Sequence, residues 1–471
     1  MRDAADSDER STAAAEPAAR SGDASHPGAD TIAAAGMIRA FAALLALTCA
    51  LALPASAAQQ WLVVSDIHFD PFAAGASPAG YGKDSNAALL DATLAQMLRV
   101  NPHPPVVVIA GDFLAHRFAQ LAAQHHEDAQ TAAVRAMRAI AHRFGTAFPH
   151  ARFIVALGNN DDYCGDYRSE DGGSYQRALE RIWLPLVQRG GAHTSFARTF
   201  LHGGFYSDDV LNGRLRVLVV NDIPWSFFAG GPCQPARGDL AATERAWLAR
   251  EVQSGRSSAI VSHIPPGIDA GTTALLRGFL NVPFLRSNAQ AAFVHDVQAP
   301  GIRWALFGHT HRFELRSIGN TPALVISSIS PVYDNNPAFY VVAVEPNGSL
   351  ADVRTEYFDE VAQRWRSAGS LDRSFGIARF DGRALADVHR RIARDPSLRA
   401  RWQAQAVSWS TRVKQPHWRY AWCAQRVPTI DYAGCAHTTT RRALALGAAI
   451  AIALGALTTI VLFVRRRRRR V

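Results

Sequence analysis

Residues Trp61-Leu62-Val63-Val64-Ser65-Asp66-Ile67-His68 form a short apolar run that ends in an aspartate and a histidine. Near-continuous apolar runs of this length are typical of strands that are buried on both faces of a sheet. Four similar runs follow along the chain, and each ends in polar residues of the same kinds. These endings are Gly111-Asp112, Gly158-Asn159-Asn160-Asp161, His263, and Gly308-His309-Thr310-His311.

Helical patterns lie between several of these runs, at residues 86–100, 117–144, 174–187 and 241–252. Strands that alternate with amphipathic helices predict a sheet with helices on both faces. After Pro322 the pattern changes to consecutive strands, including 339–344 and 350–357. The sequence therefore predicts an α/β fold in which a second, more antiparallel sheet packs on the first.

The polar endings are candidate ligands of one site, because loops at the carboxyl ends of strands converge in α/β sheets. A single buried histidine is more often a satisfied core residue than a ligand, but five endings of this type together favour a metal site. Imidazole and carboxylate groups suit Zn²⁺, Mn²⁺ or Fe²⁺. One carboxylate can bridge two such ions about 3.5–4 Å apart.

The order D-x-H, G-D, G-N-x-D, H, G-H-x-H resembles that of the calcineurin-like metallophosphoesterases. Within them, the chain is similar to the acid sphingomyelinase-like phosphodiesterases and the endopolyphosphatases over about residues 61–357. Three shorter segments add to the resemblance: Tyr81-Gly82 followed by Asp84-Ser85, the run 262–267, and residues 329–333 leading to Asn336-Pro337.

This resemblance implies an αββα sandwich with two divalent metal ions, for which we expect Zn²⁺, with Mn²⁺ or Fe as alternatives. It implies three ligands for each ion and one shared carboxylate. The first ion would be held by Asp66, His68 and His311, the second by Asn159, His263 and His309, and Asp112 would bridge them.

One position departs from the family pattern. Asn160 stands where the family usually has a histidine, and an amide can donate a hydrogen bond to a phosphoryl oxygen but cannot protonate a leaving group. His116 lies four residues beyond Asp112, as in the sphingomyelinase-like pattern, so we assign it the general-acid role; the alternative is a structural or capping histidine. Asp161 and Asp162 are expected to form the turn or to orient a ligand histidine.

The charge of the chain is concentrated at one end. The formal net charge is +10, with 50 Lys and Arg against 40 Asp and Glu, but residues 465–470 are all arginine. The remainder is only weakly basic, so we expect no specific nucleic-acid partner. Hydrophobic residues make up 48% of the chain, which excludes a wholly disordered protein.

Both ends carry apolar segments. Residues 443–464 contain no charged side chain and would extend about 33 Å as a helix, which predicts a transmembrane helix rather than a buried core helix. The positive-inside rule then places the Arg-rich tail 465–471 in the cytoplasm and the rest outside the cell membrane, in the periplasm or extracellular space. Residues 37–57 have the pattern of a secretory signal peptide. Residues 1–36 are expected to be a disordered extension or the result of a misplaced start.

Four cysteines remain after the signal segment, an even number that favours two disulfides in an exported chain. Three connectivities are open, of which we favour Cys164–Cys233 and Cys423–Cys435. The catalytic domain is expected over 58–360, and a helical, disulfide-stapled subdomain over 381–437.

The resulting hypothesis is a membrane-tethered phosphodiesterase in which a hydroxide that bridges the two metals attacks phosphorus. Its substrate would be a small-molecule or lipid phosphodiester outside the cytoplasm, and the C-terminal helix would be its contact with the membrane. Two alternatives stay open: a hydrolase of polyphosphate or nucleotide phosphoanhydrides, and a non-catalytic receptor or scaffold with the same fold.

Overall fold

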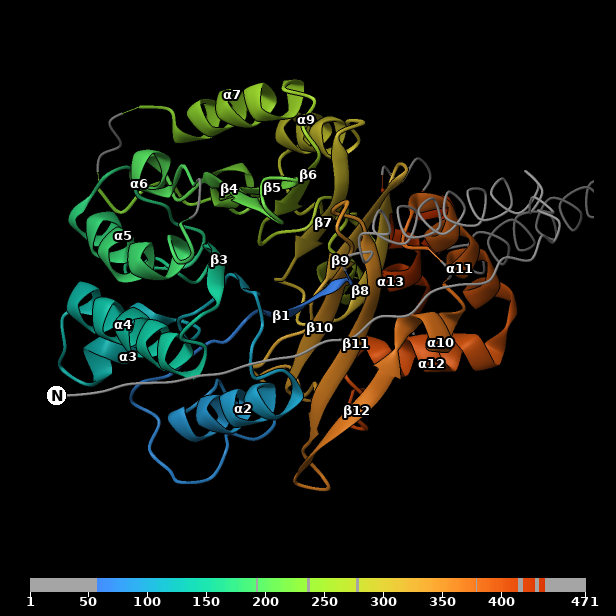
Figure 1. Ribbon diagram of the computed structural model, residues 1–471. Coiled ribbons are helices and arrows are strands. Elements are labelled where there is room, and N and C mark those ends of the chain that lie inside the picture. Colours follow the sequence, from blue (N-terminus) through green and yellow to red (C-terminus); the bar gives the residue numbers. More distant parts are fainter. Residues whose placement is uncertain are drawn as a thin grey trace, which may run out of the picture. The chain divides into compact units, whose positions relative to one another are not determined.

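The computed structural model describes residues 57–191, 194–234, 238–276, 279–377, 379–413, 418–427 and 432–436. These residues form two β-sheets with helices packed on them (Figure 1). The predicted α/β class and the presence of two sheets are thus confirmed. The predicted segments 1–36, 37–57 (apart from residue 57), 443–464 and 465–471 lie outside the described residues.

The first sheet has six strands in the order β12-β11-β10-β1-β2-β3. Strands β1, β2 and β3 run parallel, whereas β10 pairs antiparallel with β1 and continues into an antiparallel meander. The strands are β1 (Gln59–Val64), β2 (Val106–Ala110), β3 (Arg152–Ala156), β10 (Ala338–Val344), β11 (Leu350–Asp359) and β12 (Arg364–Ser370).

The second sheet has seven strands in the order β13-β8-β9-β7-β6-β5-β4. Strands β5, β6, β7 and β9 run parallel at its centre. The strands are β4 (Tyr206–Val210), β5 (Leu215–Val219), β6 (Ser258–Val261), β7 (Ile302–Phe307), β8 (Glu314–Ile318), β9 (Thr321–Val325) and β13 (Arg426–Val427).

The predicted division of strands between the sheets is wrong. The strands after Pro322 do not form a sheet of their own, because β9 joins the second sheet while β10, β11 and β12 extend the first. The cause is the pairing of β10 with β1, in which Val342 lies opposite Trp61. This pairing covers an edge of β1 that would otherwise expose unpaired backbone groups.

The predicted helices at 86–100, 174–187 and 241–252 are confirmed, but the one at 117–144 is two helices. Asp128 starts the second of them, since its side chain accepts a hydrogen bond from Thr131 N, and His126 just before it has φ 57°. The α-helices are α2 (Ala87–Val100), α3 (Phe118–Gln124), α4 (Ala129–Ala147), α5 (Ser174–Val187), α6 (Phe196–Thr199), α7 (Leu240–Gln253), α8 (Ala270–Leu275), α9 (Ser287–Val297), α10 (Leu371–Phe375), α11 (Gly382–Arg394), α12 (Pro396–Ala406), α13 (Trp418–Ala424) and α14 (Tyr432–Ala436), with 3-10 turns η1 (Phe200–His202) and η2 (Ile223–Trp225).

Alternating side chains of β7 show how the layers pack. Trp304 and Leu306 belong to the large core, where Trp304 meets Trp61 of the first sheet at 6.0 Å between ring centroids. Ala305 and Phe307 point to the opposite face, into a second core beneath α7 and α9. Helices α2, α4 and α5 lie beside the first sheet (Figure 1). This layering matches the predicted αββα sandwich.

The segment predicted as a C-terminal subdomain is helical but contributes to the main body. Strand β13 pairs with β8, and Leu385, Val388 and Trp402 belong to the large core. The predicted disulfides Cys164–Cys233 and Cys423–Cys435 are both present. Among the residues that the structure describes, no helix has the length and apolar character needed to cross a membrane.

Candidate metal centre

Five strands from the two sheets deliver the predicted ligands to one place. Asp66, Asp112, His263 and His309 each follow the last residue of a strand by two positions, and Asn159 follows β3 by three. The chain bends sharply at these points. Five predicted ligands have a left-handed backbone conformation that residues other than glycine rarely adopt. They are Asp66 (φ 50°), His68 (φ 45°), Asp112 (φ 56°), His309 (φ 73°) and His311 (φ 55°).

Two glycines of the motifs allow these loops to approach one another. A Cβ atom at Gly158 would collide with the backbone nitrogen and the carboxylate of Asp112, and one at Gly308 would collide with Ser65 Oγ. The space beside Asp112 therefore admits only glycine without a shift of the backbone.

We predict that Gly158→Ala lowers the rate of phosphoester hydrolysis about a hundredfold, because a displacement of about 1 Å at a catalytic group can cost that much. Initial rates and bound metal would be measured on the same preparations. Gly238→Ala is the matched control, since a Cβ at that position meets no atom within 4 Å. Wild-type activity in Gly158→Ala would show that the approach to Asp112 is not required.

The Asp112 carboxylate stands at the centre of the site. Its Oδ2 atom lies 3.4 Å from His68 Nε2 and 3.3 Å from His263 Nε2. One oxygen therefore faces an imidazole from each predicted ligand set. All three side chains are almost fully buried.

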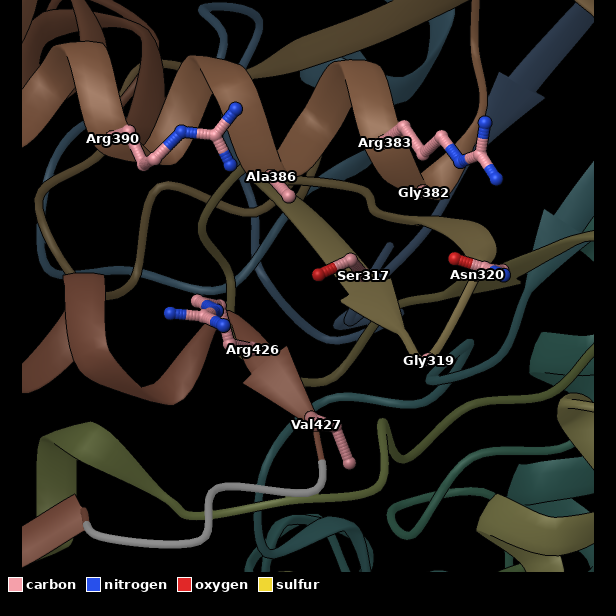
Figure 2. Close-up of a pocket in the computed structure, with 9 residues that line it drawn as sticks. All are labelled: Ser317, Gly319, Asn320, Gly382, Arg383, Ala386, Arg390, Arg426 and Val427. Carbon is pink, nitrogen blue, oxygen red and sulfur yellow. The ribbon is translucent and has the colours of Figure 1, made fainter.

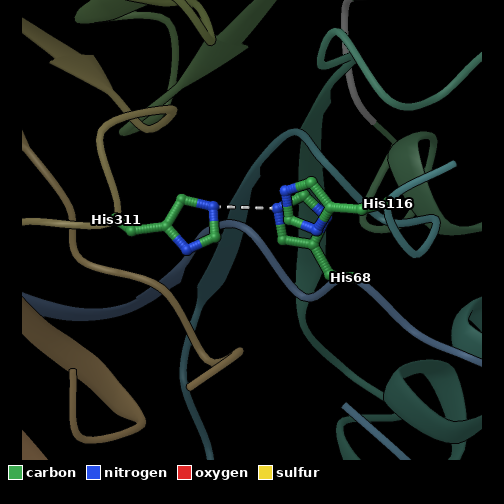
Figure 3. Close-up of side chains that lie close together, drawn as sticks. All are labelled: His68, His116 and His311. Atoms are coloured by element: carbon green, nitrogen blue, oxygen red, sulfur yellow. Dashed lines mark hydrogen bonds between the residues drawn. The ribbon is translucent and has the colours of Figure 1, made fainter. Parts of the chain in front are cut away.

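The first predicted ligand set is compact. His68 Nε2 and His311 Nε2 are 3.0 Å apart, and Asp66 Oδ1 lies 3.5 Å from His311 Nε2 (Figure 3). Asp66 also accepts from His309 N with both carboxylate oxygens, at 3.1 Å each, which links the two sets through the backbone.

The second set gathers around the side chain of Asn159. Its Oδ1 lies 3.1 Å from His263 Nε2 and 2.7 Å from His309 Nδ1. Its amide nitrogen donates to Asp166 Oδ1 at 2.6 Å. That hydrogen bond settles the direction of the amide and turns the oxygen toward the two histidines.

The hydrogen bonds of the histidines fit a bound cation. His68 Nδ1 donates to Leu114 O at 3.0 Å and His263 Nδ1 donates to Ala110 O at 2.7 Å, so in each ring Nε2 is the atom that faces Asp112. Two neutral rings would present nitrogen lone pairs to a carboxylate oxygen, which is unfavourable without a cation between them. The His, Asp and Asn donors suit Zn²⁺, Mn²⁺ or Fe²⁺. In the part of the chain that the structure describes, four groups of residues have ligand atoms close enough for a metal, and three of these groups lie in this site.

The pKa values of the site also indicate that positive charge is favoured beside the Asp112 carboxylate. Burial lowers the pKa of His68 and His263, but Asp112 together with Asp66 and other neighbouring groups outweighs burial and raises the two pKa values to about 9 and about 10. Burial and the neighbouring His263 lower the pKa of His309 to about 3. For Asp112, the two histidines outweigh the effect of burial and hold the pKa well below its usual value.

His116 lies at the open side of the first set. Its ring stacks on that of His68, with 3.9 Å between centroids, and its side chain is 24% exposed (Figure 3). His116 Nδ1 lies 2.8 Å from Asp84 Oδ1, and Asp84 Oδ2 accepts from His116 N at 2.9 Å. The carboxylate thus fixes the ring and leaves Nε2 directed away, with Tyr333 OH 3.5 Å from it.

The side chain of Asn160, for which a hydrogen bond to a phosphoryl oxygen is predicted, contacts the central carboxylate. Its amide nitrogen donates to Asp112 Oδ2 at 2.9 Å, and its backbone N–H donates to Asp112 Oδ1 at 2.8 Å. The side chain is buried and holds the central carboxylate. Its contact with a phosphoryl oxygen stays a prediction.

The Asp161 carboxylate joins two loops through hydrogen bonds. It accepts hydrogen bonds from the backbone N–H groups of Asp112, Phe113, Leu114 and Gly158 at 2.6–3.2 Å. These hydrogen bonds stabilise the turn that contains Asp161 and join it to the loop that carries Asp112, in line with the turn-forming role expected for Asp161. The pKa of Asp162 is raised to about 7 by burial and by Glu170.

Asp84, Asp166 and Tyr333 extend the site beyond the predicted residues. Asp84 and Tyr333 lie in segments that contribute to the family resemblance, but their contacts with His116 join positions 32 and 217 residues apart. No local pattern marks Asp166 as the partner of Asn159.

The two-sheet fold and the histidine-rich donor set define a metallophosphoesterase. The chain belongs to the calcineurin-like phosphoesterase family, whose model matches residues 61–313. The resemblance predicted from the motifs is confirmed, and the enzyme class that it implied, a phosphoric ester hydrolase, is that of the family.

Two curated relatives carry phosphodiesterase names. The chain is 30% identical over 298 residues to "Sphingomyelinase phosphodiesterase D" of Dictyostelium discoideum, covering 60% of this chain and 62% of that protein's length. It is 24% identical to human "Acid sphingomyelinase-like phosphodiesterase 3b", covering 74% of this chain and 83% of the relative. Among solved structures, Plasmodium GAP50 matches with a TM-score of 0.37 and 10% identity over 67% of this chain and 88% of that one.

Proposed function

We propose that this protein hydrolyses phosphodiesters at a centre of two divalent metal ions. One observation carries the proposal: Asp112 Oδ2 lies between His68 and His263, at 3.4 and 3.3 Å from their Nε2 atoms. A carboxylate in this position is suited to bridge two ions, one in each predicted ligand set. Zn²⁺ is the preferred occupant on donor chemistry, with Mn²⁺ and Fe as alternatives.

The chain's own residues have separate tasks in this mechanism. Asp66, His68 and His311 would hold one ion, Asn159, His263 and His309 the other, and the two ions would polarise the phosphoryl group and activate water for attack. Asn160 and Asp161 hold Asp112 and its loop in place. His116, held by Asp84, would deliver a proton from Nε2 to the leaving oxygen.

The relatives favour a phosphodiester of the sphingomyelin type as the substrate class. Both curated names refer to sphingomyelinase-like phosphodiesterases. The leaving group of a lipid phosphodiester is a poorly acidic alcohol, so its oxygen needs a proton donor. We assign that role to His116.

A substrate panel tests this proposal. The full-length chain, loaded with Zn²⁺ or Mn²⁺, would be assayed with sphingomyelin, bis-nitrophenyl phosphate, nitrophenyl phosphate, nucleoside di- and triphosphates, cyclic nucleotides and polyphosphate. We expect diesters to be cleaved with a higher kcat/KM than monoesters and anhydrides. No hydrolysis of any ester by a chain with bound metal would contradict the proposal.

A phosphoanhydride hydrolase is the second candidate, and Asn160 favours it. No histidine occupies that position, and a phosphate leaving group departs without the strong need for protonation that an alkoxide has. Preference for polyphosphate or nucleotides over every diester in the same panel would select this alternative.

We further propose that the chain is tethered to a cell membrane with its catalytic body outside the cytoplasm. The uncharged run 443–464 before the arginines at 465–470 supports this orientation. The two disulfides are also typical of an oxidising compartment. Protease added to cells from which any outer envelope has been removed should digest the catalytic body and spare a tag fused after residue 471; protection of the body would contradict the orientation.

A further inference from the structure

A cavity of about 480 Å³ lies at the end of β8 farthest from His311. Strand β8 begins at Glu314, three residues after His311, and its five residues extend about 16 Å. The cavity is therefore separate from the candidate metal centre. Its lining includes Ser317, Asn320, Arg383, Arg390 and Arg426.

Among the residues that the structure describes, three arginines and no acidic side chain line this cavity. Arg383 and Arg390 come from α11, and Arg426 comes from β13 (Figure 2). In Figure 2, Arg383 and Arg390 lie along α11 on one side and Arg426 lies on β13 across from them, with Ser317 and Asn320 in between. A concave surface that gathers charges of one sign focuses their potential and attracts a counter-ion.

The carboxylates beside α11 do not balance the charge of Arg383 and Arg390. Asp387 pairs with Arg390 at 3.1 Å but also with Arg391 at 3.0 Å. The Asp381 carboxylate accepts from Ala384 N at 2.8 Å and caps α11. Among the described residues, Arg383 forms no ion pair.

We propose that this cavity binds a phosphate-bearing anion. Guanidinium groups form paired hydrogen bonds with phosphate oxygens, and a tetrahedral group with several charged oxygens can be shared by arginines that approach from different sides. A carboxylate has two oxygens in one plane, which a single arginine satisfies. The volume falls in the range of small-molecule sites and exceeds the needs of an isolated phosphate ion, so an organic portion also fits.

The test compares two variants of equal charge change. Arg383→Gln/Arg390→Gln/Arg426→Gln removes the three guanidinium groups of the cavity. The matched control Arg99→Gln/Arg250→Gln/Arg303→Gln removes three exposed arginines from other elements. Both sets are placed in the full-length chain that also carries Asp112→Asn, and metal is removed with a chelator, so that phosphate binding at the metal centre does not contribute.

Binding of inorganic phosphate would be followed by calorimetric titration. We expect the cavity variant to bind at least about tenfold more weakly than its parent, since the loss of even one charge-assisted hydrogen bond has an effect of that size. The control should bind as its parent does. The double variant Arg383→Gln/Arg390→Gln, which retains Arg426, covers the case in which the triple variant does not fold.

Vesicles of phosphatidylcholine with and without phosphatidylglycerol separate the two sources of such an anion. Binding of free phosphate alone assigns the cavity to a soluble phosphorylated molecule, and arginine-dependent binding of the anionic vesicles assigns it to a lipid head group; both support the site. Undiminished phosphate binding in the cavity variants, or an equal loss in the control, would overturn it.

Discussion

Asp112→Asn is expected to remove hydrolysis almost completely and to leave the protein with fewer than two bound metal ions. The Oδ2 atom of Asp112 is the shared atom of the two predicted ligand sets, 3.4 Å from His68 Nε2 and 3.3 Å from His263 Nε2. An amide carries no negative charge and has a single oxygen that can coordinate. Several kcal/mol of transition-state stabilisation come from a metal pair, so the expected loss is at least about a thousandfold.

Metal content and initial rates would be measured together on wild type and variant. Asp208→Asn is the matched control, because Asp208 is a fully buried carboxylate on β4, outside the metal centre. The control should keep its metal and its rate. Two tightly bound ions in Asp112→Asn would show that this carboxylate is not the bridge.

Most residues of the site could be predicted from the sequence, because their positions along the chain follow a local rule. Each predicted ligand follows an apolar strand by a few residues, and the ends of such strands meet. The same rule says nothing about how each side chain is aimed. The left-handed backbone of His68 and His311, which turns their Nε2 atoms to within 3.0 Å of each other, follows from tertiary contacts and has no sequence signature.

The strand order was less predictable for a related reason. The sequence pattern of consecutive antiparallel strands after Pro322 is the same whichever sheet they join. The sheet is determined by the pairing of β10 with the edge of β1. Side-chain partners are equally non-local. The amide of Asn160 can hydrogen-bond to a phosphoryl oxygen or to a protein carboxylate, and only the fold shows that Asp112 Oδ2 lies 2.9 Å away.

His116→Ala is expected to slow substrates with poor leaving groups much more than substrates with good ones. The Asp84 carboxylate 2.8 Å from His116 Nδ1 keeps the proton of that nitrogen engaged and directs Nε2 away from it. General-acid catalysis contributes about 10²–10⁴-fold where the leaving oxygen must be protonated, and little where it is already a stable anion. The loss should therefore reach about a hundredfold or more for an alkyl diester and stay small for bis-nitrophenyl phosphate.

The stack of His116 on His68 supplies the competing explanation, because at 3.9 Å between centroids the ring could act only as a support for the ligand histidine. A support role predicts equal losses on both substrates, together with weaker metal binding. Asp84→Asn separates the two roles, because the amide can still hold the ring through its oxygen but no longer places a negative charge beside Nδ1. If both variants lose activity selectively on the substrate with the poor leaving group and keep their metal, His116 is the proton donor and Asp84 is its positioning residue. Equal losses of activity on both substrates would show that His116 is a structural histidine.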